Sequence, residues 1–284
     1  MPVTPVLSEL ISDPEVAEAL RVHAAERTRL LDHLSTLFRE DQRVRAAWLW
    51  GSFSRGEQDD LSDLDPWLLV SDEHVGGMGK SLVAMCEAAG SVVSYGENPN
   101  NGPKGGGYLG VLLAGSHGLH HVDLYWQSVS SGEVPGWAVL FDRSSDSAPS
   151  LEPAGTSTEV AETPLEENRG RIAFIWLMLS VVAKYLARDP DSDMALLSYP
   201  RNAFEETVEQ LGLQGEIGDV GWSVPLGPLA KVDTLRRIAE KTALLEEACR
   251  MRGLPISAEA NPCLMRYFEL VAGIIEARPW GGGV

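Results

Sequence analysis

The order of apolar and polar residues divides the chain into a first part that mixes helices with strands and a second part that is helical. Apolar residues recur at helical spacing through 14–38, where Asp13 and Pro14 have the identities expected of an N-cap and a first helical residue. A shorter helix is expected over 80–89, ended by Gly90. Short apolar runs between turn residues predict strands over 44–50, 66–70, 92–95, 108–114, 119–127 and 137–142.

The strand pattern stops after residue 142. Residues 144–163 are poor in bulky side chains and rich in Ser, Pro, Ala, Thr and Glu, which is typical of a linker. The segment 165–187 is apolar nearly all round and is expected at the centre of a bundle. Amphipathic helices follow over 203–211, 228–251 and 258–277. We therefore expect an α+β fold, in which a domain with a small mixed β-sheet (1–148) and a linker (149–163) precede an all-α helical-bundle domain (164–284).

Composition and cysteine use favour a soluble cytoplasmic protein. The apolar content of 44% and charged content of 23% are ordinary for globular domains. The uncharged run 172–183 is too short to span a membrane, and the acidic start of the chain lacks a signal-peptide pattern. The three cysteines, Cys86, Cys249 and Cys263, lie at no metal-binding spacing, as expected in a reducing compartment.

The net charge of −18 restricts the partners. Such a surface repels nucleic acids and anionic membranes, so neither is expected to bind. It attracts small polycations. The alternative is that the charge serves only solubility.

Residues 51–65, GSFSRGEQDDLSDLD, contain the most informative motif. Asp63 and Asp65 are one residue apart, so on a strand their carboxylates share a face. Like charges this close need a cation, and hard oxygen ligands suit Mg²⁺, which shares its shell with phosphates. Gly51 permits close approach of the backbone to a phosphate, and Ser52 offers a hydroxyl and an N–H.

This pattern, Gly-Ser followed after ten residues by Asp-x-Asp, resembles the signature of the DNA polymerase β-type nucleotidyltransferase superfamily. More narrowly, it resembles the small bacterial enzymes that adenylylate antibiotics. The family's third carboxylate, in an apolar-Asp-apolar strand, is matched by Asp123 within LHHVDLYW. Pro66 departs from the pattern, since a proline there implies an edge strand or a bulge.

The resemblance implies a nucleotidyltransferase domain, a reaction and a set of ligands. Asp63, Asp65 and Asp123 would hold two Mg²⁺ ions, with ATP or another nucleoside triphosphate as co-substrate. AMP would pass to a hydroxyl of a small molecule and pyrophosphate would leave. The acceptor would be an antibiotic, with a cationic aminoglycoside first because of the charge and a lincosamide next, and the role would be antibiotic resistance.

Further residues are candidates with a structural alternative beside each. Arg55 can hold a phosphate or pair with Glu57 or Asp59 at the surface. Lys184 is a candidate for the triphosphate, because related enzymes use a basic residue from the helical domain. The possible general bases are Glu133, Glu166 and Glu167, and the cations that could lie near an anion are Arg169 and Arg171. The histidine pair is His120 and His121, one of which could lie near Asp123. The aromatic residues that could line an acceptor site are Trp67, Tyr125, Trp126 and Trp176.

Two other functions remain open on the sequence. A nucleotidyltransferase of the toxin–antitoxin type would modify a protein or RNA, although the acidic surface argues against RNA. A non-enzymatic nucleotide-binding regulator is disfavoured by the intact Asp63, Asp65 and Asp123. The sequence leaves the oligomeric state open, with a homodimer as one alternative.

Overall fold

The computed structural model of the chain describes residues 7–98, 100–131, 138–144, 164–189, 191–218, 220, 222, 227–254 and 256–277. Its fold is mixed α+β. The strands are β1 (Val44–Leu49), β2 (Pro66–Val70), β3 (Val92–Glu97), β4 (Gly106–Gly115), β5 (Gly118–Ser128) and β6 (Ala138–Asp142). The helices are α1 (Pro14–Glu40), α2 (Gly51–Arg55), α3 (Met78–Ala89), α4 (Pro164–Arg188), α5 (Ser198–Leu211), α6 (Gln214–Ile217), α7 (Pro228–Met251) and α8 (Ala260–Ala277).

The strands form one six-stranded sheet in the order β3-β4-β5-β2-β1-β6. The β2–β5 pair is parallel, and the other neighbouring strands are antiparallel. A parallel pair needs a crossover, which here consists of α3, β3 and β4. The pairing of Trp67 with Tyr125, continued by the bridge between Leu64 and Val122, fixes the register of β2 against β5.

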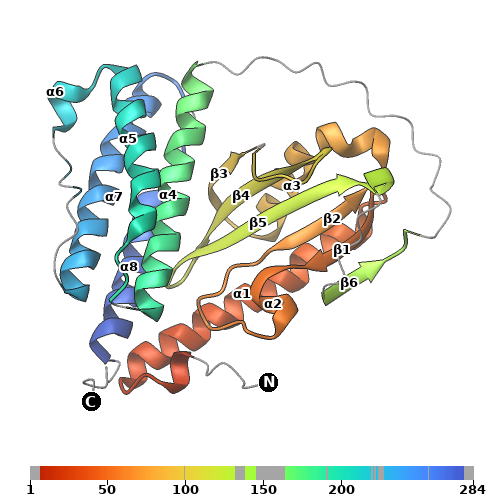
Figure 1. Cartoon of the computed structure of the whole chain (residues 1–284), viewed down its shortest axis with the longest axis horizontal. Coiled ribbons are helices and arrows are strands. Elements are labelled where there is room, and N and C mark those ends of the chain that lie inside the picture. The colour runs from red at the N-terminus through yellow and green to blue at the C-terminus, as the bar shows by residue number, and fades with distance from the viewer. Residues whose placement is uncertain are drawn as a thin grey trace.

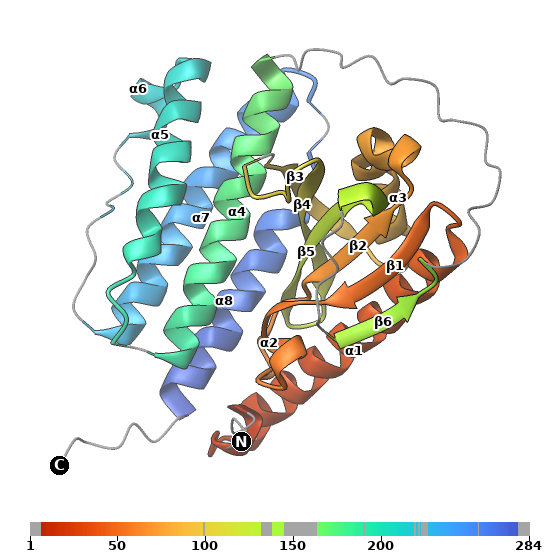
Figure 2. The same ribbon diagram turned by 45° about the vertical axis from the view of Figure 1, so that its right-hand side comes forward.

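Helices cover the two faces of the sheet differently. On one face, Leu34 and Phe38 of α1 and Leu82 of α3 pack with inward residues of β4 and β5 in one hydrophobic core. On the other face, Leu112 and Leu119 join the core of the helical bundle. Figures 1 and 2 show α4, α5, α7 and α8 side by side, with α4 and α8 against the β3–β4–β5 end of the sheet. The opposite end of this face, around β2 and β1, lies away from the bundle.

Helix α4 is the central element of the bundle, as its sequence predicts. Its residues 165–188 are long and apolar enough, by length and composition, to cross a membrane. In the structure most of this segment is buried between the sheet and the other helices. Helix α4 therefore connects the sheet to the bundle, and its last turns lie beside the residues of the Asp-x-Asp motif.

Several predicted elements are confirmed. The side chain of Asp13 accepts hydrogen bonds from the amides of Glu15 and Val16, so it caps α1. Strands β4 and β5 form the expected hairpin, with Gly115 paired to Gly118. All described residues from 164 onward outside loops are helical. The proposed linker and the boundaries at 148 and 163 fall outside the described residues.

Three local expectations were wrong. Pro66 does not mark an edge strand or a bulge: it is the first residue of the interior strand β2, a position where its missing N–H does not interrupt the ladder. The turn after β1 is a short helix, α2, and not only a tight turn. Helix α5 begins at Ser198, five residues before the predicted start, since Pro200 in its first turn needs no intrahelical donor.

The β4–β5 hairpin gives a stability prediction. Gly118 has φ +129°, and a Cβ there would lie 2.6–2.8 Å from backbone and Cβ atoms of Tyr267 on α8. We expect Gly118→Ala to lower the free energy of unfolding by about 3 kcal/mol, from backbone strain and overpacking. Gly56→Ala is the matched control: φ is also positive (+68°), but nothing lies within 4 Å, so about 1 kcal/mol is expected. Equal losses in urea unfolding would contradict the close α8 contact.

Candidate functional site

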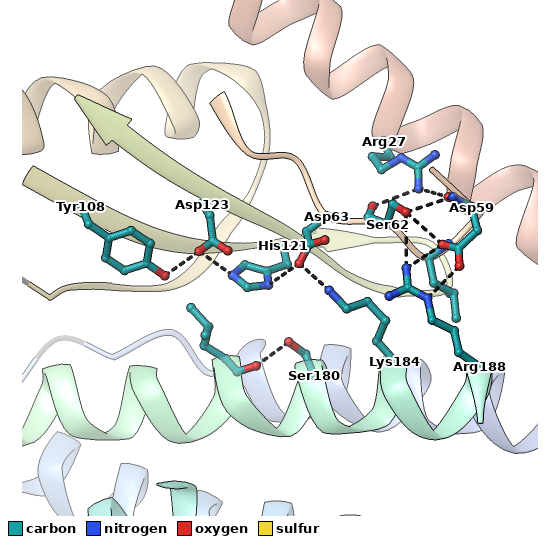
Figure 3. Close-up of polar contacts among 12 residues, drawn as sticks. Arg27, Asp59, Ser62, Asp63, Tyr108, His121, Asp123, Ser180, Lys184 and Arg188 are labelled. Carbon is teal, nitrogen blue, oxygen red and sulfur yellow. Dashed lines mark hydrogen bonds and ion pairs between the residues drawn. The ribbon is translucent and has the colours of Figure 1, made fainter. Parts of the chain in front are cut away.

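The carboxylates of the sequence motif lie together on the sheet face toward α4. Because Leu64 bridges Val122 in parallel, its neighbours Asp63 and Asp65 lie beside His121 and Asp123, which flank Val122. Leu64 and Val122 point to the opposite face and are fully buried. The alternation of the two strands thus places three carboxylates and one imidazole in a compact group. Figure 3 shows Asp63, His121 and Asp123 of this group.

A continuous chain of polar contacts runs through this group. Nζ of Lys184, from α4, forms an ion pair with Oδ2 of Asp63. Nδ1 of His121 lies 3.6 Å from the same oxygen, and its Nε2 lies 3.0 Å from Oδ1 of Asp123. Figure 3 shows Lys184 extending from α4 toward Asp63. His121 therefore stands between Asp63 and Asp123, and Lys184 adds a second positive group beside Asp63.

Tyr108 of β4 extends the chain. Its hydroxyl donates a 2.5 Å hydrogen bond to Oδ1 of Asp123. Gly110, which pairs with Asp123 across β4 and β5, makes room for this contact, since a Cβ there would lie 2.8 Å from the hydroxyl oxygen. Burial and the neighbouring Asp123 raise the pKa of Tyr108, so the hydroxyl stays protonated and remains a donor. Asp123 is thus oriented from two sides, by Tyr108 and by His121.

The two aspartates of the motif differ in their electrostatics. Burial disfavours the charge of Asp63, but Lys184 and His121 outweigh it and hold its pKa at about 2. Burial, together with the charges of Asp63 and Asp123, raises the pKa of Asp65 to about 7. Of the three carboxylates in this group, Asp65 is therefore the one whose charge the neighbouring basic groups compensate least, which favours a bound cation.

Gly51 and Ser52 lie beside the carboxylates, as the motif predicts. Gly51 has φ +64°, and a Cβ at this position would overlap Oδ2 of Asp65, so a larger residue would disturb that carboxylate. The amide of the preceding residue, Trp50, donates to the carbonyl of Asp65 at 2.9 Å. Oγ of Ser52 is buried and, within the part of the chain that the structure describes, has no hydrogen-bond partner. A phosphate oxygen would satisfy it.

The loop before Asp63 is held by two arginines. Arg188 of α4 forms a bidentate ion pair with Asp59 at 2.7 and 2.8 Å. Arg27 of α1 donates to the carbonyl oxygens of Asp59 and Ser62 at 2.7 and 2.9 Å. Burial opposes the charge of Asp59, but Arg188 and local hydrogen bonds lower its pKa. These contacts fix the motif loop against α1 and α4.

The residues present can hold a metal ion. Ligand atoms of Asp63, His121 and Asp123 all lie within 4.8 Å of one another. Carboxylate oxygens suit hard divalent cations, and the uncompensated Asp65 lies in the same group. The donor set and the unsatisfied Ser52 hydroxyl therefore fit a cation with bound phosphate, although nothing in the geometry identifies the metal as Mg²⁺.

Other predicted residues lie apart from this group. Arg55 forms a 2.5 Å ion pair with Glu57 at the surface, the structural alternative for this residue. Arg169 contacts Tyr95, with its guanidinium 4.8 Å from the ring centre. Arg171 forms a long ion pair with Glu167. Glu133 lies outside the described residues. The two remaining tryptophans, Trp126 and Trp176, are buried in the core.

Trp67 and Tyr125 continue the site along the sheet. They follow Asp65 and Asp123 by two residues, so they share the face of the carboxylates. Their rings stack at 5.1 Å, and Trp50 meets both at nearly right angles, at 6.1 and 5.5 Å. Trp50 is 38% exposed. An aromatic surface of Trp50, Trp67 and Tyr125 therefore adjoins the carboxylate group.

Sequence reasoning missed Tyr108 as a member of the site, and it left open which of His120 and His121 lies near Asp123. His121 precedes Asp123 by two residues, so strand alternation places it on the same face, and it is the histidine that contacts Asp123. Tyr108 carried no such signal, since its position opposite Tyr125 depends on the hairpin register. His120 points to the other face, where its Nε2 lies 3.3 Å from Glu26 of α1.

The pKa of Asp65 gives a prediction with a defined sign. A carboxyl whose pKa is raised in the folded state destabilises the fold as pH rises from about 4 through about 7. In chelator-treated protein, Asp65→Asn should therefore increase the free energy of unfolding at pH 8, on the order of 3 kcal/mol, and change it little at pH 4. Urea unfolding at both pH values measures the difference. A variant less stable than wild type at pH 8 would refute the proposed charge repulsion.

Comparisons with known proteins do not add a family to this geometry. No protein-family model matches the chain, and no curated protein matches its sequence. The resemblance to nucleotidyltransferases therefore rests on the motif residues alone.

Proposed function

We propose that the protein is a metal-dependent nucleotidyltransferase that moves a nucleoside monophosphate, AMP from ATP in the first instance, onto a hydroxyl of a small molecule. The observation that carries the proposal is the uncompensated Asp65 in a group with Asp63 and Asp123, next to Gly51 and Ser52. A cation would relieve the repulsion of these carboxylates, and a phosphate would satisfy the Ser52 hydroxyl. The proposed arrangement is a nucleotidyltransferase domain followed by a helical domain.

Each residue has a role in this reaction. Asp63, Asp65 and Asp123 would hold Mg²⁺, which when bound neutralises phosphate charge and lowers the pKa of a hydroxyl. Gly51 and Ser52 would bind the triphosphate through the backbone and the free hydroxyl. Asp123, oriented by Tyr108 and His121, would accept the proton of the acceptor hydroxyl.

The bond changes follow from these roles. The acceptor oxygen forms a bond to the α-phosphorus, and the bond between that phosphorus and the bridging oxygen to the β-phosphate breaks. Pyrophosphate leaves with the electron pair of the broken bond. The protein contributes position and charge and forms no covalent intermediate in this scheme.

The acceptor class is argued from charge and shape. The chain has a net charge of −18, and the aromatic surface of Trp50, Trp67 and Tyr125 offers ring faces beside the carboxylates. Cationic sugars would be attracted by the charge and pack on the rings. An aminoglycoside is therefore the first acceptor to test, and a lincosamide is the next.

The first test is pyrophosphate release from ATP and Mg²⁺ with a panel of aminoglycosides and lincosamides. We expect release with at least one acceptor, and Asp65→Asn should lower the rate at least about 100-fold although it stabilises the fold. This pairing separates loss of chemistry from loss of structure. Full activity in Asp65→Asn would eliminate the proposed metal site. ATP binding without release across the panel would move the acceptor to a protein or an untested metabolite.

Asp123 should affect turnover more than binding. We expect Asp123→Asn to lower kcat by about 10²–10⁴-fold, the usual contribution of a positioned proton acceptor, with a smaller change in the Kd of ATP. Tyr108→Phe is the matched variant, because it removes one orienting hydrogen bond and keeps the ring. It should lower kcat less than Asp123→Asn does. ATP affinity that falls as steeply as kcat in Asp123→Asn would assign this carboxylate to nucleotide binding.

A further inference from the structure

The ion pair of Lys184 and Asp63 involves a carboxylate that the proposed reaction needs as a metal ligand. Asp63, with His121 and Asp123, is one of three residues whose ligand atoms lie within 4.8 Å of one another and could hold a metal ion. Lys184 is 7% exposed, and its ammonium group contacts the same carboxylate oxygen that faces His121. In the structure as described, a protein cation stands where a metal cation would bind.

Little space remains beside this ion pair. The cavity between α4 and the motif loop, lined by Asp63, His121, Ser180 and Lys184 among others, has a volume of about 20 Å³. That is room for about one water molecule. A metal ion and the Lys184 ammonium group on one carboxylate would also repel each other, because solvent screens their charges weakly at this half-buried site. A metal on Oδ2 of Asp63 and the present position of Lys184 therefore exclude each other.

The rest of α4 does not have to move for Lys184 to leave. One turn further along, Arg188 holds Asp59 by two hydrogen bonds, and Arg27 of α1 holds the same loop through its carbonyl groups. These contacts do not involve Asp63. The exchange is thus within the reach of a flexible four-carbon side chain on a fixed helix.

We propose that Lys184 is an exchangeable counter-ion: it holds Asp63 until a divalent cation displaces it, and the freed ammonium group then binds the triphosphate. This inference rests on the proposed function and adds an order of events to it. The family resemblance suggested only the second of the two positions. Lys184 here is a positioning residue in the metal-free protein and a phosphate ligand in the loaded one.

The two positions predict effects of opposite sign from one substitution. With Mn²⁺ alone at pH 8, Lys184→Met should bind the ion at least about tenfold more tightly than wild type, because no ion pair has to be broken. With saturating Mn²⁺, the same variant should bind inorganic tripolyphosphate about tenfold more weakly, because the ammonium group is missing. Titration calorimetry measures both without turnover.

Lys241→Met is the matched control, since it makes the same substitution at a lysine of α7 that donates to the carbonyl of Ile217. Its affinity for Mn²⁺ should stay within about twofold of wild type. Unchanged or weaker Mn²⁺ binding in Lys184→Met would overturn the exchange. Wild-type protein that binds neither Mn²⁺ nor ATP would refute the proposed function itself, which is a separate result.

A measurement on the wild type keeps the test independent of variant folding. Amine-reactive labelling, read by peptide mass spectrometry, should increase at Lys184 when Mn²⁺ is added and decrease again with tripolyphosphate. Lys231, which is also buried and donates to the carbonyl of Ser192, is the internal control and should not respond. Labelling of Lys184 that is the same with and without Mn²⁺ would contradict the exchange.

Discussion

Repulsion among three half-buried carboxylates is the constraint on which the rest of the site depends. Asp63, Asp65 and Asp123 share one face of a parallel strand pair, where water screens their charges poorly. The protein supplies two basic groups, His121 from the same strand and Lys184 from α4, and these satisfy Asp63 and Asp123. Asp65 lacks such a partner among the described residues, so above neutral pH the fold keeps an unfavourable charge that a bound cation would neutralise.

The architecture follows from the need to bring these groups together. The parallel pairing of β2 with β5 aligns two Asp-containing strands that are separated by more than fifty residues in the chain. Helix α4 then crosses the sheet face and places Lys184 and Arg188 against the motif loop. Gly51 and Gly110 have no side chain, which leaves space for the Asp65 carboxylate and the Tyr108 hydroxyl. Stability and site geometry thus depend on the same few contacts.

The sequence predicts what depends on local pattern. The cap at Asp13, the β4–β5 hairpin, the helical second part and the shared face of Asp63 and Asp65 all follow from spacing within a few residues. The partners of Lys184 and the membership of Tyr108 do not, because they depend on pairings between distant segments. The misplaced expectation for Pro66 has the same origin: one strand alone does not reveal whether its neighbours lie on one side or both.

The central claim is that this carboxylate group binds a divalent cation together with a nucleoside triphosphate. A crystal structure with Mn²⁺ and a non-hydrolysable α,β-methylene analogue of ATP tests it most directly, since the anomalous signal locates the metal without reference to activity. The account predicts a peak within coordination distance of carboxylate oxygens of Asp63 and Asp65, with phosphate beside Gly51 and Ser52. A peak elsewhere, with Lys184 still on Asp63 and the nucleotide away from Ser52, would contradict it.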